Sequence, residues 1–295
     1  MSDNGRYDRS IEDIGNVVGL EHVNTRIPDQ QLATLFYVAG LGLTRDPYLM
    51  TGVGNMWINV GRSQFHLPTG RAQVVRGHTA IVMADRAALL ARLRALGEPL
   101  KASKFAFAER DGCVEVTCPW GNRIRVFEPG ERFGEMMLGI PYVEFEVGEG
   151  TSEGIVRFYR QILDAPANAQ SDARGRLARV AVGAGQQLIF RETNSASAPF
   201  DGHHIAIYLA DFSGPHRRLL ERRLITEESD QHQYRFQDIV DPDDGKVLFA
   251  VEHEVRSMRH PMYARPLVNR NPLLSNRSYA PGYEDQSWSL PIRAT

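Results

Sequence analysis

One stretch of this sequence is written twice. HTAIVMAD, from His78 to Asp85, aligns with HIAIYLAD, from His204 to Asp211, and five of the eight positions are identical. Each copy is rich in apolar and β-branched residues, which is typical of a strand, and a helical spacing of apolar residues follows each copy. Because an internal repeat dictates repeated structural units, it constrains the fold more than any other feature.

The repeated unit has the order β-α-β-β-β. After the His78 strand, leucines recur at helical spacing up to Gly97. Three short strands follow, and DG and PWGN turns separate them. The same order recurs after His204, and weaker versions of it precede both copies. The sequence therefore predicts four modules, which span about residues 17–70, 75–130, 138–193 and 201–255.

The modules predict an α+β fold in which four βαβββ units form two cupped mixed β-sheet domains. We expect modules one and two to form a domain over 17–130, and modules three and four a domain over 138–255. PGERFGEMML is the best candidate linker between the two. The remainder, 256–295, is rich in Pro, Asn and Arg without any period, so we expect an extended tail over the surface that frays at its end.

Composition excludes several classes of function. The formal net charge is −2, from 34 basic and 36 acidic residues, so no overall charge draws the chain to nucleic acid or to an anionic membrane. No apolar run approaches the roughly 20 residues of a membrane span, and the polar N-terminus does not resemble a signal peptide. With two cysteines, Cys113 and Cys118, we expect a reduced cytoplasmic protein and no cysteine-bound zinc.

Potential metal ligands stand at equivalent points of the first two modules. His22 opens the first strand of module one and His66 lies in its last strand; His78 opens module two and Glu128 closes it. Neutral imidazole and carboxylate groups suit Fe(II), Mn, Ni, Zn or Co, and two histidines with one carboxylate leave metal positions open for substrate or O₂. Strand alternation places further candidate lining residues beside these groups, namely Asn24, Gln64 and Trp57.

Six motifs carry a resemblance to a known family: GLEHVNTRI, QFHL, GHTAIVMAD and CPWGNRIRVFE, and in the second half GHHIAIYLAD and DPDDGKVLFAVE. With these motifs the chain resembles a tandem member of the vicinal oxygen chelate superfamily. That group includes glyoxalase I, fosfomycin-resistance proteins and extradiol dioxygenases. The resemblance implies a metal that chelates two adjacent substrate oxygens, held by His22, His78 and Glu128. It places His66 at or near a fourth ligand position, where it is also a candidate catalytic residue.

The second half lacks part of this set. By the same alignment Tyr142 stands in place of His22 and Leu188 in place of His66, while His204 and Glu252 remain. We therefore expect a degenerate second domain that serves as a structural partner, a lid or a dimer surface. Some four-module members pair the first module with the fourth and the second with the third, which would turn His22 and His66 toward His204 and Glu252. The complete set in the first half favours sequential pairing.

The resemblance implies a metal-dependent enzyme of extradiol dioxygenase type, with Fe(II) or Mn(II) favoured and Ni or Zn as alternatives. Glu115 and Asp238 stand where ring-cleaving members usually carry a tyrosine, so the resemblance supports the metal more directly than the ring cleavage. A glyoxalase-type lyase or isomerase and a non-catalytic binding protein of the resistance type are the alternatives. The expected partners are a small-molecule substrate and a second copy of the chain in a homodimer.

Overall fold

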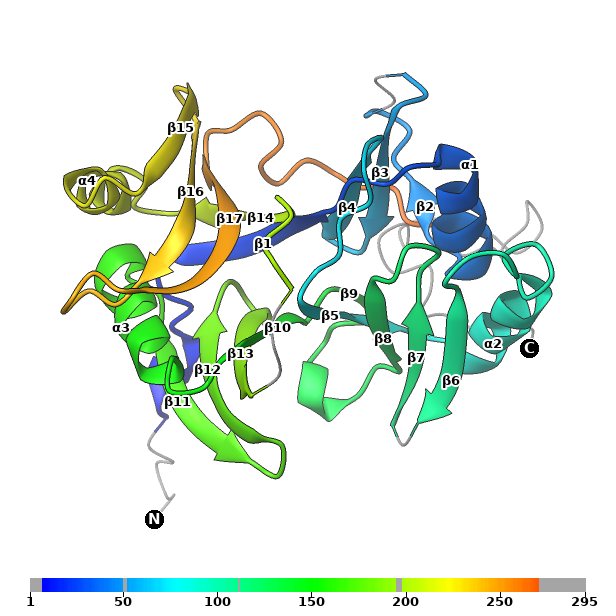
Figure 1. Ribbon diagram of the computed structural model, residues 1–295, viewed down its shortest axis with the longest axis horizontal. Helices are drawn as coiled ribbons and strands as arrows, with labels where there is room; N and C mark the ends of the chain where they lie inside the picture. Colours follow the sequence, from blue (N-terminus) through cyan, green and yellow to red (C-terminus); the bar gives the residue numbers. More distant parts are fainter. Residues whose placement is uncertain (1–6, 50–51, 111, 195–197, 271–295) are drawn as a thin grey trace, which may run out of the picture.

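The strands of this protein form two large mixed sheets in the computed structural model, which describes residues 7–49, 52–110, 112–194 and 198–270 (Figure 1). Each sheet is built from two modules of the β-α-β-β-β type, so the repeat and the α+β class predicted from the sequence are confirmed. The sheets lie one above the other in Figure 1, with helices at both sides.

The first sheet joins module one to module four. In spatial order its strands are β15 (Ile225–Asp230), β16 (Gln233–Val240), β17 (Val247–Ser257), β14 (His204–Leu209), β1 (Val17–Asn24), β4 (Ser63–Pro68), β3 (Asn55–Val60) and β2 (Thr44–Arg45). The two modules meet where β1 and β14 pair antiparallel, with Asn24 opposite His204.

The second sheet joins module two to module three. In spatial order its strands are β11 (Ala167–Asp172), β12 (Gly175–Ala181), β13 (Gln187–Thr193), β10 (Tyr142–Gly148), β5 (Gly77–Met83), β8 (Arg123–Phe127), β7 (Cys113–Thr117) and β6 (Ala106–Arg110). The short β9 (Leu138–Gly139) also pairs with β5. Here the modules meet where β5 and β10 pair antiparallel, with His78 opposite Glu144.

This topology contradicts the expected sequential pairing. Neither 17–130 nor 138–255 forms a sheet of its own, because the outer modules of the chain pair with each other and so do the inner ones. Periodicity indicates which residues belong in a strand, but it carries no information about which free edge that strand meets. The preference for sequential pairing depended on ligands assigned by alignment, and that assignment also fails, as described below.

The helices fill the space beside and between the sheets. They are α1 (Gln30–Ala33), which continues as a π-helix over Thr34–Gly40, then α2 (Arg86–Ala95), α3 (Ser152–Leu163) and α4 (Ser213–Glu221), with 3-10 turns at Arg9–Glu12 and Glu131–Phe133. The Asp29 carboxylate accepts hydrogen bonds from two backbone amides at the start of α1 and so caps this helix. None of the helices in the described ranges is long and apolar enough to span a membrane.

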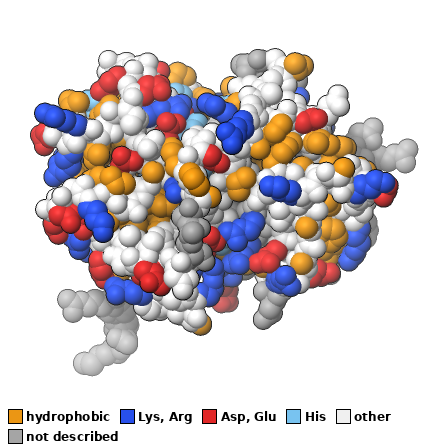
Figure 2. Space-filling view, viewed as in Figure 1, with side chains coloured by type: hydrophobic (Ala, Val, Ile, Leu, Met, Phe, Trp, Pro, Cys, Tyr) orange, Lys and Arg blue, Asp and Glu red, His pale blue; other side chains and the backbone are white. Residues whose placement is uncertain are grey.

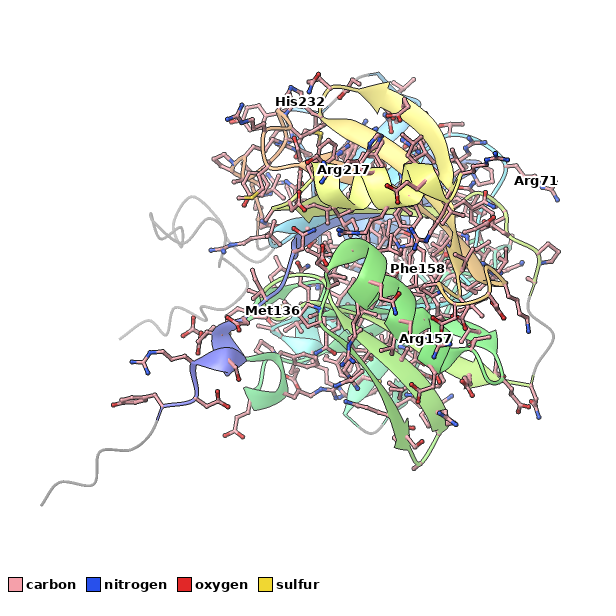
Figure 3. All side chains as sticks on the ribbon, turned by 90° about the vertical axis from the view of Figure 1, so that its left-hand side faces the viewer. Arg71, Met136, Arg157, Phe158, Arg217 and His232 are labelled. Carbon is pink, nitrogen blue, oxygen red and sulfur yellow. The ribbon has the colours of Figure 1, made fainter. Side chains whose placement is uncertain are left out.

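One continuous hydrophobic core lies between the sheets and the helices. The predicted leucines of the second module, Leu89, Leu93 and Leu96, are buried in it. Helix α3 is strongly amphipathic and contributes Phe158 and Tyr159, both fully buried. Figure 3 shows α3 directly below α4 on this side of the molecule. The core side of each sheet is thus covered. The other face carries polar groups and, on the second sheet, a smaller hydrophobic cluster that includes Val82 and Phe127.

The described part of the tail lies against module one. The backbone carbonyl of Val268 accepts a hydrogen bond from the Asn59 amide, and the Asn269 side chain pairs with both the N–H and the carbonyl of Gly61. Arg265 forms an ion pair with buried Asp46. The tail therefore wraps over the surface as expected, and its expected frayed end lies outside the described residues.

The close approach of β5 to β10 requires glycine at position 77. Its φ is +152°, and a Cβ built there would lie 1.8 Å from the backbone oxygen of Glu144. We predict that Gly77→Ala lowers the free energy of unfolding by about 1–3 kcal/mol more than Gly112→Ala does. Gly112 also has positive φ, +76°, but its Cβ would meet nothing within 4 Å, so it controls for backbone strain. Equal losses in urea denaturation would contradict this reason for the glycine.

A buried histidine makes the fold sensitive to acid. The His253 ring contacts the Tyr159 hydroxyl at 2.7 Å and the Val251 carbonyl at 2.9 Å, and burial lowers its pKa to about 3. An unfolded histidine binds a proton below about pH 6.5 while the folded one does not, so stability falls as the pH drops through this window, by about 1.4 kcal/mol per unit. We predict that His253→Gln flattens this dependence between about pH 7 and about pH 5 in chelator-treated protein, measured as the free energy of unfolding.

Candidate metal centre

A row of four polar side chains crosses the middle of the first sheet. In the register of β4, β1, β14 and β17, His66 lies beside Asn24, Asn24 opposite His204, and His204 beside Glu252. The neighbouring row contains His22, and Glu254 lies two residues beyond Glu252 on β17. Residues two apart on a strand share a face, so these groups all lie on the face opposite the core. We call this face, with these six residues, the first cup.

Three histidines converge in the first cup. His22, His66 and His204 each offer a ring nitrogen, and the three atoms lie within 4.8 Å of one another. Nε2 of His22 and Nε2 of His204 are 3.3 Å apart. His22 is fully buried, His204 is nearly so, and His66 is partly exposed. Within the described residues, this is the one group of three or more His, Cys, Asp or Glu side chains with metal-binding spacing.

The groups beside the ring nitrogens of His22 and His204 bear on which nitrogen of each ring carries the proton. Nδ1 of His22 lies 2.9 Å from the Glu21 carboxylate, and Nδ1 of His204 lies 3.4 Å from Glu252. A carboxylate only accepts hydrogen bonds, so Nδ1 of His22 carries the proton in the neutral ring and Nε2 of His22 presents a lone pair toward His204. His204 has a carboxylate 3.4 Å from each of its ring nitrogens, Glu252 at Nδ1 and Glu254 at Nε2, and the two are equivalent partners for its ring proton.

Carboxylates and arginines surround the histidines. An oxygen of Glu254 lies 3.4 Å from Nε2 of His204. Arg235 forms ion pairs with both Glu252 and Glu254, and Arg256 forms ion pairs with Glu254 and Glu21. Three carboxylates against two guanidinium groups leave one negative charge beside three uncharged rings, which favours a cation at their centre.

An irregularity in β1 turns Glu21 toward the cup. The pairing of β1 with β14 shifts register between Leu20 and His22, which breaks the strict alternation of faces. The Glu21 carboxylate consequently reaches three groups on the cup face: the His22 ring, the Tyr208 hydroxyl at 2.8 Å, and Arg256. The bulge thus supplies the carboxylate that orients His22.

His66 is held by side chains of module one. Its ring stacks on Trp57 with centroids 3.8 Å apart and an interplanar angle of 12°. Nε2 lies 2.8 Å from the Asn55 side-chain oxygen and Nδ1 lies 2.7 Å from the Asn24 amide nitrogen. This pairing places the proton on Nε2 and leaves the Nδ1 lone pair facing Asn24.

Burial keeps all three rings uncharged. Desolvation lowers the pKa of His22 and of His204 well below the usual range, and nearby charges, Arg256 for His22 and Arg235 for His204 among them, act in the same direction. Desolvation lowers the pKa of His66 to about 2. The site therefore presents neutral imidazoles, which is the form that binds metals.

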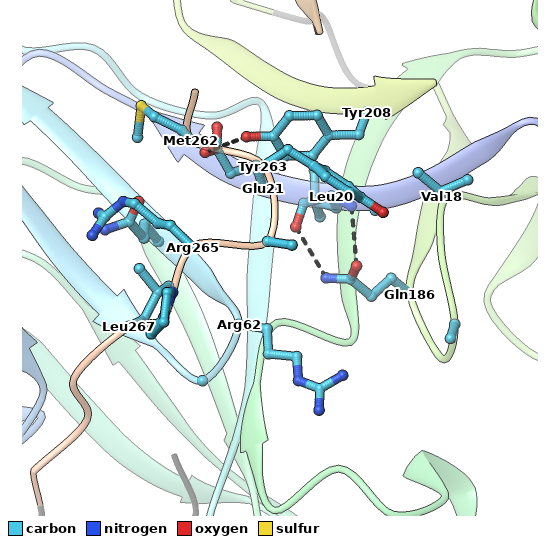
Figure 4. Close-up of a pocket in the computed structure, with 16 residues that line it drawn as sticks. Val18, Leu20, Glu21, Arg62, Gln186, Tyr208, Met262, Tyr263, Arg265 and Leu267 are labelled. Atoms are coloured by element: carbon cyan, nitrogen blue, oxygen red, sulfur yellow. Dashed lines mark hydrogen bonds between the residues drawn. The ribbon is translucent and has the colours of Figure 1, made fainter. Parts of the chain in front are cut away.

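A cavity of about 610 Å³ lies beside this cluster. Glu21, Gln64 and Tyr208 contribute to its wall from the first sheet, and Met262 and Arg265 contribute from the tail (Figure 4). Figure 2 shows basic side chains and histidine atoms at the notch in the upper part of the molecule. The tail thus forms one wall of a space large enough for a small molecule.

The structure does not assemble the predicted ligand set of His22, His78 and Glu128. His78 lies on β5 in the second sheet, where Nε2 is 3.5 Å from the Tyr142 hydroxyl. Strand β8 ends at Phe127, so Glu128 follows the strand, and its side chain is exposed. Matching RVFE to FAVE aligned Glu128 with a residue in mid-strand, which is why this part of the prediction fails.

The other candidate residues divide between the two sheets. Leu188 is buried in the core and Tyr142 lies beside His78, so neither joins the cluster. Gln64 donates hydrogen bonds to Asp46 and Asn59 near the cup. His204 and Glu252, expected in a degenerate half, are part of the cluster itself.

Sequence reasoning missed several residues of the first cup. Glu254 had a usable signal, because it stands two residues beyond Glu252 on the same strand face. Arg256 continues that spacing. No sequence signal marked Glu21, because only the bulge in β1 brings its side chain to this face.

Comparison with known proteins supports the fold alone. No family model and no curated protein sequence matches the chain. A protein from Bacillus subtilis described as a candidate dioxygenase superposes with a TM-score of 0.55 at 16% identity, over 84% of this chain and 87% of its own. Glyoxalase I from Zea mays superposes with a TM-score of 0.57 at 14% identity, over 81% and 92%. The described part of this chain therefore has the tandem βαβββ fold of the vicinal oxygen chelate superfamily.

Proposed function

We propose that this protein is a metal-dependent enzyme whose first cup binds a small molecule through two adjacent oxygens, with a dioxygenase-type reaction on a vicinal diol. The observation that carries the proposal is the convergence of His22, His66 and His204, whose ring nitrogens lie within 4.8 Å of one another, with the Nε2 atoms of His22 and His204 only 3.3 Å apart.

The donor set fits a divalent transition metal. Nitrogen ligands at about 2.0–2.1 Å from a shared ion lie roughly 2.8–3.0 Å apart in an octahedral arrangement and roughly 3.3–3.4 Å apart in a tetrahedral one, and the observed Nε2 separation of 3.3 Å falls within this span. His22, His204 and the Glu254 carboxylate would hold the ion. His66 would be either a further ligand through Nδ1 or a group facing the substrate.

Two imidazoles and one carboxylate favour Fe(II) or Mn(II), while Ni and Zn remain alternatives for a set with a third histidine. When bound, the metal would act as a Lewis acid toward the diol oxygens and leave positions for exchangeable ligands. The free, buried thiols of Cys113 and Cys118 support a reducing, cytoplasmic setting.

The residues of the chain itself would bind and orient the metal ligands and the substrate. Glu21 fixes the tautomer of His22, and Glu252 lies beside the His204 ring, an arrangement typical of groups that support metal ligands. His66 is partly exposed at the cup, so it would face the substrate and orient it. The stack on Trp57 keeps this ring in place.

A glyoxalase-type isomerase is the second candidate. The third histidine favours it, because a ligand set of three imidazoles and a carboxylate leaves fewer open positions for O₂ together with a chelating substrate. In that case a carboxylate of the cup would be the base that moves a proton between two substrate carbons.

We predict that His22→Ala and His204→Ala each lower metal affinity more than about tenfold, since each removes a ligand. His78→Ala is the matched control, because His78 is also buried at the start of a central strand but lies on the other sheet. Elemental analysis after reconstitution with Fe(II) or Mn(II) and desalting measures the difference. Equal metal content in the His204→Ala and wild-type proteins would contradict the site.

A second experiment separates the two reactions. We predict O₂ uptake with catechols by the Fe(II)- or Mn(II)-loaded protein, and no conversion of hemithioacetals. His66→Gln should lower turnover about a hundredfold while metal content stays unchanged, because it removes a group that orients the substrate. Conversion of hemithioacetals without O₂ uptake would favour the isomerase, and loss of metal from His66→Gln would make His66 a ligand.

A further inference from the structure

The second sheet has a polar cavity of its own, about 670 Å³ in volume, on the face opposite the core. We call it the second cup. Its position corresponds to that of the first cup because each sheet is built from two modules of the same type, joined in the same way. Its chemistry differs, since its wall contains many arginines: Arg110, Arg125, Arg132, Arg174, Arg179 and Arg191.

Positive charge is in excess in the second cup. The described residues that line it include three carboxylates, Glu115, Glu144 and Asp172, against six guanidinium groups. Arg110 and Arg125 share Glu115, while Arg174 and Arg191 share Glu144.

Two of the arginines have no carboxylate partner among the described residues. The Arg132 guanidinium stacks over Phe127 and Phe133, 4.4 Å from each ring centre. Stacking uses the face of the guanidinium, so its N–H groups remain available in the plane. Arg179 donates to the Gln187 side-chain oxygen from one nitrogen, which leaves further donors.

Ion pairs of the buried Arg191 side chain hold the floor of the cup in a fixed geometry. Arg191 is 7% exposed and binds Asp172 through two hydrogen bonds of 2.8 Å, and it also contacts buried Glu144 at 3.3 Å. The side chains between the arginines are partly apolar, with Phe127, Tyr142 and Ile189 in the wall. In the lower half of Figure 2, basic side chains gather over this part of the molecule.

From this arrangement we propose that the second cup binds a small organic dianion with an apolar or aromatic body. Two acidic groups on the ligand would meet the arginine donors, and the body would lie against the aromatic wall near Arg132. Planar guanidinium groups bind carboxylate and phosphate oxygens in pairs, and excess positive charge in a cavity attracts anions. The site is independent of any metal in the first cup.

The test uses chelator-treated full-length protein and isothermal titration calorimetry, with phthalate as the probe. Phthalate carries two carboxylates on an aromatic ring, benzoate carries one, and inorganic phosphate lacks the ring. We expect phthalate to bind with one equivalent per chain and more tightly than either of the others. An absence of heat from phthalate at millimolar concentration and low salt, or binding no tighter than that of benzoate, would overturn the proposal.

Variants locate the binding site. The double variant Arg132→Gln/Arg179→Gln removes the two arginines without a carboxylate partner and should weaken phthalate binding about tenfold or more. Arg217→Gln is the control for charge, because Arg217 is exposed on α4, outside the cup (Figure 3). Equal weakening in this control, or weakening by His204→Ala, would overturn the assignment to the second cup. Circular dichroism of each variant confirms that it folds.

Discussion

The antiparallel pairing of β1 with β14 is the contact on which the candidate metal centre depends. It joins strands from the first and last modules, and it places Asn24 opposite His204 at the seam. His22 and His204 stand on the two strands of this seam, and β4 and β17 carry His66 and Glu254 on either side. A different partner for β1 would separate the two Nε2 atoms that define the site.

The local sequence pattern was sufficient to predict the four modules, but it was not sufficient to predict which modules pair with each other. The repeat of HTAIVMAD as HIAIYLAD and the helical leucines follow from short-range rules, and the structure confirms the strands and the helix that they predict. Strand pairing is a long-range property, and two equivalent free edges differ too little in sequence to reveal their partners.

The candidate site was likewise predictable only in part, since the sequence indicated single residues but not which of them come together. His22, His66 and His204 stood out because neutral nitrogen donors occur at repeated strand positions, and these three converge. His78 stood out by the same criterion and lies in the other sheet, since residue type cannot indicate which sheet a strand joins. Glu21 depended on a register shift in β1, which no alternating pattern encodes.

Duplication of one unit has given two cups of opposite charge. In the first, arginines neutralise most of the carboxylates that orient histidines, and the balance is negative. In the second, Tyr142 and Arg125 occupy the region near His78, and the balance is positive. The same scaffold thus carries the candidate cation site on one sheet and the proposed anion site on the other.

The nested topology sets an order of events during synthesis. Modules two and three are adjacent in the chain, so the second sheet can close as soon as the ribosome has released about residue 193. Module one must wait with the edge of β1 unpaired until β14 emerges, and the loop it closes encloses the whole of the other sheet. The histidine cluster is therefore completed late, only after β14, the first strand of the fourth module, has been made.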